Sequence, residues 1–319
     1  MIGLYTFIFI FSCIILLYSG GLLVKGLTRI ARFLKWKKFV VAFFVMAFAG
    51  SIPNLFIGIN SAFHKIPQLS FGDVVGGNVI DLTLAVALVF LITKVSIPAR
   101  GQLIQTSSVF TIAVALLPII LILDGKLGRG DGILLISAFI FYAFWLFSKK
   151  ERFSKVYERK GKDSIIGFKL FIKDLVSVIF ALILLLGATD GIVRSASVFA
   201  ENLNVPISLI GILVVGIGNA LPEMYFAVVS AKKGETGMIL GNLMGSIMVP
   251  ATLVLGIVAF ICPIEIINFS PYAVARFFLV MAALFFFFAV RTDGKITKKE
   301  AILLLGIYIA FVFFELLIK

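Results

Sequence analysis

Two stretches of the chain carry the same pattern of glycine, proline and polar residues. The first reads Ala49-Gly50-Ser51-Ile52-Pro53-Asn54 and resumes as Gly72-Asp73-Val74-Val75-Gly76-Gly77-Asn78-Val79-Ile80-Asp81. The second reads Gly218-Asn219-Ala220-Leu221-Pro222-Glu223 and resumes as Gly241-Asn242-Leu243-Met244-Gly245-Ser246-Ile247-Met248-Val249-Pro250. An ungapped offset of 169 residues superposes the two stretches. An internal repeat in which Gly and Pro interrupt matching apolar segments is typical of the binding site of a membrane transporter.

The composition is that of an integral membrane protein. Hydrophobic residues make up 61% of the chain and charged residues only 14%, whereas about 25% of a soluble domain is charged. Apolar runs of about 20 residues predict ten spans, at 3–24, 39–63, 71–93, 103–123, 131–148, 174–199, 206–231, 237–261, 272–290 and 299–318. The first run lacks a basic start and a cleavage pattern, so we interpret it as a span rather than a signal peptide.

The net charge of +13 indicates membrane orientation. Basic residues gather in alternate loops, above all at 25–38 and 149–173, and the positive-inside rule places such loops in the cytoplasm. Both termini are therefore predicted outside. This alternation argues against a nucleic-acid partner. We expect a monomeric, multi-pass protein of the cell membrane, in contact with the lipid bilayer.

The chain divides into two halves of five spans each. Residues 1–148 hold the first half, with its motif at about 45–88, and residues 174–319 the second, with its motif at about 214–257. A basic cytoplasmic connector, 149–173, joins them and is too short for a domain. Because five is odd, the second half must be inverted relative to the first. The predicted fold class is thus an all-α polytopic membrane protein of ten transmembrane helices in two inverted five-helix repeats.

Two carboxylates, Asp81 and Glu223, lie near the centres of their spans. A charge at that depth is costly, so a functional role is the default interpretation; a structural hydrogen bond or buried ion pair is the alternative. Pro222 is predicted to break its helix, which would place Glu223 in the first turn of a half-helix. Asp73 lies nearer the outer end of its span and is either the residue that cations meet first or a helix cap.

These groups could form a cation site. Calcium takes six to eight oxygen ligands. Asp81 and Glu223 offer carboxylate oxygens, Asn54 and Asn219 offer amide oxygens, and interrupted backbone near Gly50 and Gly218 could offer carbonyls. Two carboxylates balance one divalent ion, but equally two sodium ions or two protons, so the charge alone leaves the ion open.

The paired motifs resemble the two alpha repeats of the sodium/calcium exchanger family, within the calcium/cation antiporter superfamily. The family motif reads G-T-S-x-P-E, followed by G-N-x-x-G-S-N-x-x-N or D, and residues 218–223 and 241–246 are similar to it. The resemblance extends over essentially the whole chain. It implies a secondary antiporter, with no cofactor and no enzymatic activity, that exchanges calcium against sodium by alternating access. It also implies that the first and sixth spans form the gating pair.

The sequence departs from the family at the ligands. Asn54 replaces an acid of the first repeat. The second motif usually ends in Asn in the first repeat and in an acid in the second, but here it ends in Asp81 and Pro250. The usual three carboxylates would then become two, which implies fewer sodium ions or protons per divalent ion. Gly50 and Asn219 replace threonines, and Ala220 replaces a serine. The remaining hydroxyls, expected to be auxiliary ligands, are those of Ser51 and Ser246.

Three other functions compete with calcium/sodium exchange. One is a proton-driven or other-cation exchanger, and another is a degenerate family member that no longer transports calcium. The third is a membrane enzyme, because Phe71-Gly72-Asp73 matches part of the Gly-x-Gly-Asp motif of intramembrane proteases. Residue 70 is Ser and no Tyr-Asp partner motif occurs, so this match is too weak to predict an enzyme.

Overall fold

The computed structural model describes residues 2–33, 50–93, 97–99, 102–148, 164–232, 237–266, 270–292 and 294–317. The helices are α1 (Ile2–Phe33), α3 (Ile52–Phe63), α4 (Pro67–Leu82), α5 (Leu84–Thr93), α6 (Gln102–Leu121), α7 (Arg129–Ser148), α8 (Ser164–Leu203), α9 (Ile207–Ile210), α10 (Gly216–Lys232), α11 (Gly237–Val249), α12 (Leu255–Ile261), α13 (Ser270–Thr292) and α14 (Lys298–Leu317). Residues 39–49 of the predicted second span and 149–163 of the connector lie outside the described residues.

Eight described helical segments are long and apolar enough to cross a membrane. They are Ile2–Leu27, Pro67–Thr93, Gln105–Asp124, Leu170–Leu203, Ile207–Val229, Ile239–Ile261, Tyr272–Arg291 and Lys298–Leu317. The predicted spans at 39–63 and 131–148 correspond to α3, a shorter apolar helix, and to α7. The predicted all-α, polytopic class is confirmed, while the count of ten and the orientation of the termini remain predictions.

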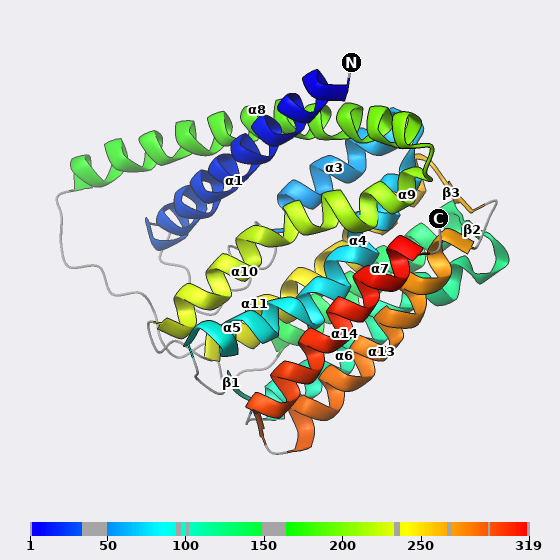
Figure 1. The fold of residues 1–319 in the computed structure, drawn as a ribbon. Helices are drawn as coiled ribbons and strands as arrows, with labels where there is room; N and C mark the ends of the chain where they lie inside the picture. The colour runs from blue at the N-terminus through cyan, green and yellow to red at the C-terminus, as the bar shows by residue number, and fades with distance from the viewer. Residues whose placement is uncertain are drawn as a thin grey trace.

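The repeat is visible in the helices and strands themselves. The 169-residue offset carries α7 onto α14 and the two-residue strand β2 (Lys126–Leu127) onto β4 (Lys295–Ile296), end for end. Each of these two strands belongs to an antiparallel two-stranded ribbon that joins the two halves of the chain. In one ribbon β2 pairs with β3 (Ile264–Glu265), and in the other β4 pairs with β1 (Ile97–Pro98). The two ribbons lie at opposite ends of the bundle, and both termini lie toward the end that holds β2 and β3 (Figure 1).

A salt bridge joins the two strands of one ribbon, and a hydrogen bond ties this ribbon to α4. Lys126 Nζ lies 2.8 Å from Glu265 Oε1. This hydrogen bond and the charge of Lys126 lower the pKa of the Glu265 carboxyl. Gln68 Nε2, in the first turn of α4, donates a 3.0 Å hydrogen bond to the backbone oxygen of Glu265. The ribbon therefore anchors the start of α4, the helix that carries two of the acidic residues discussed below.

Two hydrophobic clusters divide the interior. The larger lies among α4 to α7 and α10 to α14, and its biggest fully buried side chains are Phe71, Phe286 and Phe311. The smaller joins α1 and α8 to the inner helices through residues such as Leu16, Leu185 and Ile57. α1 and α8 run side by side along one face of the molecule, over α3 and α10 (Figure 1). This pair is thus packed separately from the main bundle.

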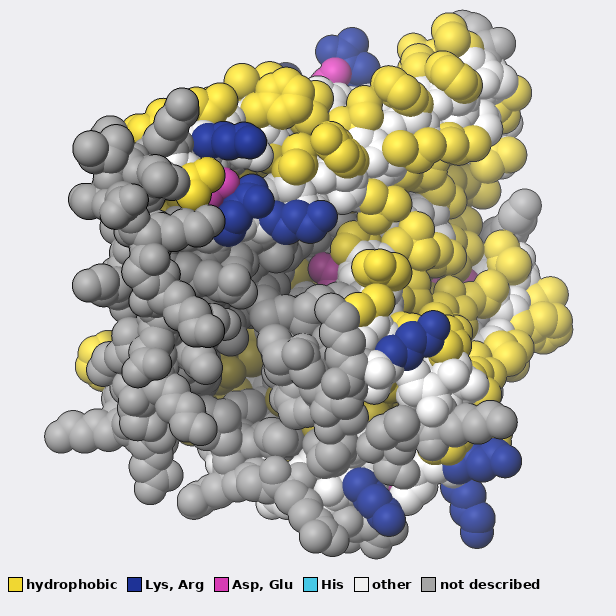
Figure 2. Space-filling view, turned by 90° about the vertical axis from the view of Figure 1, so that its left-hand side faces the viewer, with side chains coloured by type: hydrophobic (Ala, Val, Ile, Leu, Met, Phe, Trp, Pro, Cys, Tyr) yellow, Lys and Arg dark blue, Asp and Glu magenta, His cyan; other side chains and the backbone are white. Residues whose placement is uncertain are grey.

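The basic side chains gather at one end. Figure 2 faces the end that lies on the left in Figure 1, and the Lys and Arg side chains visible there outnumber Asp and Glu. The helix ends and the strand on this side contribute Lys25, Arg29, Lys173, Lys232, Arg291 and Lys295. Such an asymmetry is what the positive-inside rule describes, so it is consistent with the predicted cytoplasmic side.

The predicted helix break is present at Pro53, where α3 begins at Ile52, but not at Pro222. Pro222 is inside α10, which continues through it, so Glu223 is not in the first turn of a half-helix as predicted. Instead, π-helical segments precede α10 and follow α11, at Gly211–Val215 and Pro250–Val254. In the first half, Thr83 separates α4 from α5. Neighbouring helices can satisfy the carbonyl that Pro222 releases, so an internal proline need not end a buried helix.

Candidate functional site

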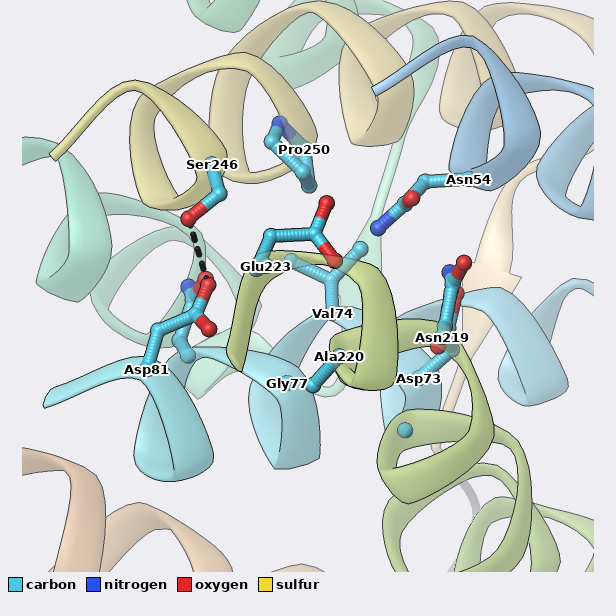
Figure 3. Close-up of a pocket in the computed structure, with 12 residues that line it drawn as sticks. Asn54, Asp73, Val74, Gly77, Asp81, Asn219, Ala220, Glu223, Ser246 and Pro250 are labelled. Atoms are coloured by element: carbon cyan, nitrogen blue, oxygen red, sulfur yellow. Dashed lines mark hydrogen bonds between the residues drawn. The ribbon is translucent and has the colours of Figure 1, made fainter. Parts of the chain in front are cut away.

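The candidate site is a cavity among α3, α4, α10 and α11. Its polar lining consists of Asn54 from α3, Asp73, Asn78 and Asp81 from α4, Asn219 and Glu223 from α10, and Ser246 from α11; small or apolar residues complete it (Figure 3). The space that a water-sized sphere can occupy inside it is about 10 Å³, about the volume of a single such sphere. A lining of this size and polarity fits small ions better than an organic substrate.

The face of α4 that lines the cavity is set by residues four apart. Asp73, Gly77 and Asp81 line it together, as the helical period requires. On an adjacent side, α4 packs against backbone: a Cβ added to Gly72 would lie 2.3 Å from the carbonyl oxygen of Ser208, and one added to Gly76 would lie 2.3 Å from that of Ile212. Only glycine permits this approach, which holds both acidic residues in place.

Asp81 is fixed from the other half of the chain. Ser246 Oγ lies 2.6 Å from Asp81 Oδ2 and donates a hydrogen bond to it, while also lying 2.9 Å from the backbone oxygen of Leu243. Figure 3 shows this bond between α11 and α4. Asp81 is only 4% exposed, and its other oxygen, Oδ1, has no hydrogen-bond partner.

Asp73 corrects the sequence prediction. It lies well inside α4, is 1% exposed and lines the cavity, so it is neither a helix cap nor an exposed first contact for cations. Asn219 Nδ2 lies 3.2 Å from Asp73 Oδ2 and 3.4 Å from Oδ1, and donates to the carboxylate. Because a carboxylate in its ionised form only accepts hydrogen bonds, this contact fixes which end of the Asn219 amide faces Asp73.

Three acceptor oxygens in the cavity have no hydrogen-bond partner. They are Asn54 Oδ1, Asp81 Oδ1 and Glu223 Oε2, from three different helices, and all three are buried atoms. No Lys, Arg or His occurs among the described residues that line the cavity. Buried acceptors without donors are costly, and oxygens of this kind are ligands of hard cations.

Three of the predicted ligands lie outside this lining. Gly50 and Ser51 precede α3, and Ser51 is buried. Gly218 lines a neighbouring apolar pocket together with Cys13 of α1. Because Pro222 has no N–H, the Gly218 carbonyl lacks its usual donor within the helix. Cation binding by these residues and by the five predicted residues that do line the cavity remains a prediction.

The whole chain can be compared with known proteins. The family model described as sodium/calcium exchanger protein matches residues 4–148 and again residues 173–317. The two matches are separated by the same 169-residue offset that relates the two motifs. The chain belongs to the sodium/calcium exchanger family. Membership makes it a multi-pass secondary transporter, a cation antiporter rather than an enzyme.

Similar proteins match this exchanger over nearly its full length. It is 26% identical to the inner membrane protein YrbG of Escherichia coli, covering 95% of this chain and 94% of that protein. It is 22% identical to the sodium/calcium exchanger MaX1 of Methanosarcina acetivorans, covering 98% of both chains. A solved structure of the sodium-calcium exchanger NCX_Mj, soaked with Na⁺ and Sr²⁺, matches with a TM-score of 0.66 and 26% identity over 98% of both chains.

Proposed function

We propose that this exchanger moves Ca²⁺, or a divalent cation of similar size, in one direction and Na⁺ in the other. The observation that carries the proposal is the set of three buried, unpartnered oxygens: Asn54 Oδ1, Asp81 Oδ1 and Glu223 Oε2. Carboxylate and amide oxygens are hard ligands, which suit Ca²⁺ and Na⁺ better than soft transition metals. The names of MaX1 and NCX_Mj, both sodium/calcium exchangers, support the same pair of ions.

The residues would have distinct roles. Asp81 and Glu223 would provide charged ligands and Asn54 a neutral one. Ser246 would hold Asp81 through the 2.6 Å hydrogen bond and, if it turned toward the ion, contribute its hydroxyl oxygen. Asn219 would position Asp73, to which it is hydrogen-bonded. These groups come from both halves of the chain, and all of them lie on α3, α4, α10 and α11.

The cavity holds three carboxylates rather than two. The resemblance to the family implies two carboxylate ligands, Asp81 and Glu223, in place of the usual three. It therefore implies that fewer sodium ions are exchanged per divalent ion than in typical members. That count leaves out Asp73, which also lines the cavity, and the number of sodium ions exchanged stays a prediction. A site with three carboxylates has the charge to bind one divalent and one monovalent cation together, or three monovalent cations.

The pair α1 and α8 is the element that we propose to move. Its residues form a hydrophobic cluster separate from that of the main bundle. The pair also borders the apolar pocket beside Asn219, through Phe9, Cys13 and Ile192. Movement of the pair over α3 and α10 would open this region to one side of the membrane or the other, which is alternating access.

Flux in liposomes tests the proposal. The purified protein is reconstituted, and ⁴⁵Ca²⁺ uptake is followed with an outward Na⁺ gradient, an outward proton gradient or neither. We expect uptake with the Na⁺ gradient alone, lost in Glu223→Gln and retained in Glu315→Gln, which neutralises a buried carboxylate outside the cavity. Uptake driven only by protons would favour the proton-coupled alternative. Folded protein without Ca²⁺ uptake under any gradient would contradict the proposal.

A further inference from the structure

We infer that a groove between α13 and α14 binds one anionic phospholipid, with the lipid phosphate at Lys299 and the start of an acyl chain between Phe285 and Leu303. The lipid would come from the leaflet at the basic end of the molecule, the predicted cytoplasmic side. The groove shares no lining residue with the cavity that holds the acidic residues. Lipid binding there would therefore be independent of which ions the protein transports.

The α13–α14 groove lies on a helical hairpin. α13 and α14 run side by side, and the turn between them lies at the end that holds β1 and β4 (Figure 1). Near this end the groove is lined by the apolar side chains of Phe285, Phe288 and Leu303 and by Lys299 and Glu300. The space that a water-sized sphere can occupy inside it is about 260 Å³, close to the lower limit of about 300 Å³ for ligand pockets. The groove is therefore large enough for an organic group.

The apolar part of the groove opens to the surface of the bundle. Phe285 is 41% exposed and Leu303 is 44% exposed, and both lie within apolar segments that are long enough to cross a membrane, Tyr272–Arg291 and Lys298–Leu317. Side chains exposed on such segments face the hydrocarbon of the bilayer. Lys299 is the second residue of its segment and so lies near the headgroups, with Leu303 about 6 Å deeper along the helix.

The polar end of the groove presents a positive charge. Lys299 is exposed, and a lysine ammonium is a common ligand of phosphate. Glu300 also lines the groove, but its Oε2 accepts hydrogen bonds from the Thr297 N–H at 2.7 Å and from the Thr297 hydroxyl at 2.8 Å. These bonds hold the carboxylate at the first turn of α14, where the helix dipole stabilises a negative charge. The charge that the groove offers to a ligand is therefore that of Lys299.

The surroundings of the groove have the same sign of charge. Residues 291–300 hold more basic than acidic residues, namely Arg291, Lys295, Lys298 and Lys299 against Asp293 and Glu300. Arg291 Cζ lies 4.5 Å from the centre of the Phe287 ring, which holds this cation at the end of α13. Basic pockets between membrane helices on the cytoplasmic side attract anionic headgroups. Next to an apolar groove, such a cluster matches both the phosphate and the acyl chain of one lipid molecule.

A non-specific layer of lipid is the competing explanation. Exposed apolar surface on a membrane helix contacts acyl chains whatever headgroup they carry. Such contact would depend neither on the charge of one particular lysine nor on the space between Phe285 and Leu303. Headgroup preference and matched single substitutions therefore separate the two explanations.

The test measures lipid binding by native mass spectrometry of the purified full chain in detergent, titrated with dioleoyl phosphatidylglycerol or dioleoyl phosphatidylcholine. We expect the wild type to prefer phosphatidylglycerol, and Lys299→Gln to weaken its binding about fivefold, the effect of one cation near an anionic headgroup. The matched control Lys298→Gln removes an exposed lysine outside the groove lining and should bind like the wild type. Equal affinity of the wild type for both lipids, or equal losses in the two variants, would overturn the inference.

A second pair of variants tests the apolar part of the groove. Leu303→Trp fills the space, whereas Ile302→Trp places the same ring on the same helix outside the groove lining. Both replaced side chains are exposed, so both variants are expected to fold. We expect Leu303→Trp to weaken phosphatidylglycerol binding several-fold, and Ile302→Trp to leave it unchanged. Equal binding by the two variants, or displacement of the lipid by an excess of inorganic phosphate, would overturn the role of the groove.

Discussion

Ser246 Oγ donates a 2.6 Å hydrogen bond to Asp81 Oδ2, and this contact links the second half of the chain to the first inside the cavity. The offset of 169 residues places Gly77, one helical turn before Asp81, at the position equivalent to Ser246. The two halves therefore do not contribute equivalent groups. The first half supplies the carboxylate and the second supplies the hydroxyl that orients it, which leaves Asp81 Oδ1 free to face the cavity.

Replacing Ser246 with Ala should destabilise the protein without bound ion. The substitution leaves Asp81 Oδ2 buried without a donor, which costs about 1–3 kcal/mol. Thermal unfolding in detergent measures the loss, and added Ca²⁺ should recover part of it because the ion can then satisfy both oxygens of Asp81. Ser61→Ala is the control, since Ser61 donates to the backbone of Gly58 and does not line the cavity. Equal responses of both variants to Ca²⁺ would refute the prediction.

The two equivalent glycines Gly72 and Gly241 should respond differently to alanine. A Cβ at Gly72 would lie 2.3 Å from the backbone oxygen of Ser208, whereas one at Gly241 would meet nothing within 4 Å. We expect Gly72→Ala to cost about 1–3 kcal/mol through overpacking and to disturb transport by shifting α4. Gly241→Ala should be close to wild type in thermal stability and flux. Similar stabilities for the two variants would show that α4 is not held by this contact.

Cross-linking should distinguish the moving pair from the fixed bundle. Asn60 Nδ2 of α3 lies 2.7 Å from Thr189 Oγ1 of α8. In a variant without Cys13 and Cys262, cysteines at positions 60 and 189 joined by a short bifunctional thiol reagent should block ⁴⁵Ca²⁺ flux, because α8 is then tied to α3.

The matched control joins α1 to α8 instead. The rings of Phe9 and Phe199 lie 5.6 Å apart, and cysteines at these positions, joined by the same reagent, should leave flux intact because the two helices move together. Loss of flux in this control, or persistence of flux in the cross-linked 60–189 variant, would contradict movement of α1 and α8 as a unit.

Restoring an acid at Asn54 should strengthen divalent binding. Asn54→Asp places another carboxylate where Asn54 Oδ1 has no partner. If the added charge contributes about 1.4 kcal/mol, the Ca²⁺ concentration for half-maximal uptake falls about tenfold, and release should slow at the same time. Asn60→Asp, on the same helix but outside the cavity lining, should leave this concentration unchanged. A rise in the half-maximal concentration for Asn54→Asp would argue against Asn54 as a ligand.

Much of the architecture follows from the internal repeat. The offset read from Pro53 and Pro222 also relates α7 to α14 and β2 to β4 in the structure. It further relates Thr83 to Thr252, whose hydroxyls hydrogen-bond the equivalent backbone oxygens of Val79 and Met248. These threonines lie at the interruptions after α4 and α11, which hydropathy cannot detect because both segments remain apolar throughout.

The sequence mispredicts two features of the site, the depth of Asp73 and the continuity of α10 through Pro222. Both depend on how the helices pack against one another. Span lengths alone predict that Asp73 lies near the end of its span, close to a membrane surface. The structure extends α4 back to Pro67 and packs Gly72 and Gly76 against backbone, which brings Asp73 into the cavity. The spacing of eight residues between Asp73 and Asp81, close to one face of a helix, was the available signal. The sequence around Pro222 carries no signal that α10 continues through this residue, because that continuity depends on the neighbouring helices.

The most direct test of the account is to locate the ion. A crystal of the protein soaked in Sr²⁺, as a strongly scattering substitute for Ca²⁺, would give an anomalous difference map. We predict a peak within about 2.3–2.8 Å of Asn54 Oδ1, Asp81 Oδ1 and Glu223 Oε2, the three unpartnered oxygens, in the range of calcium-type coordination. A protein that transports the ion but shows its peak away from these oxygens would contradict the account.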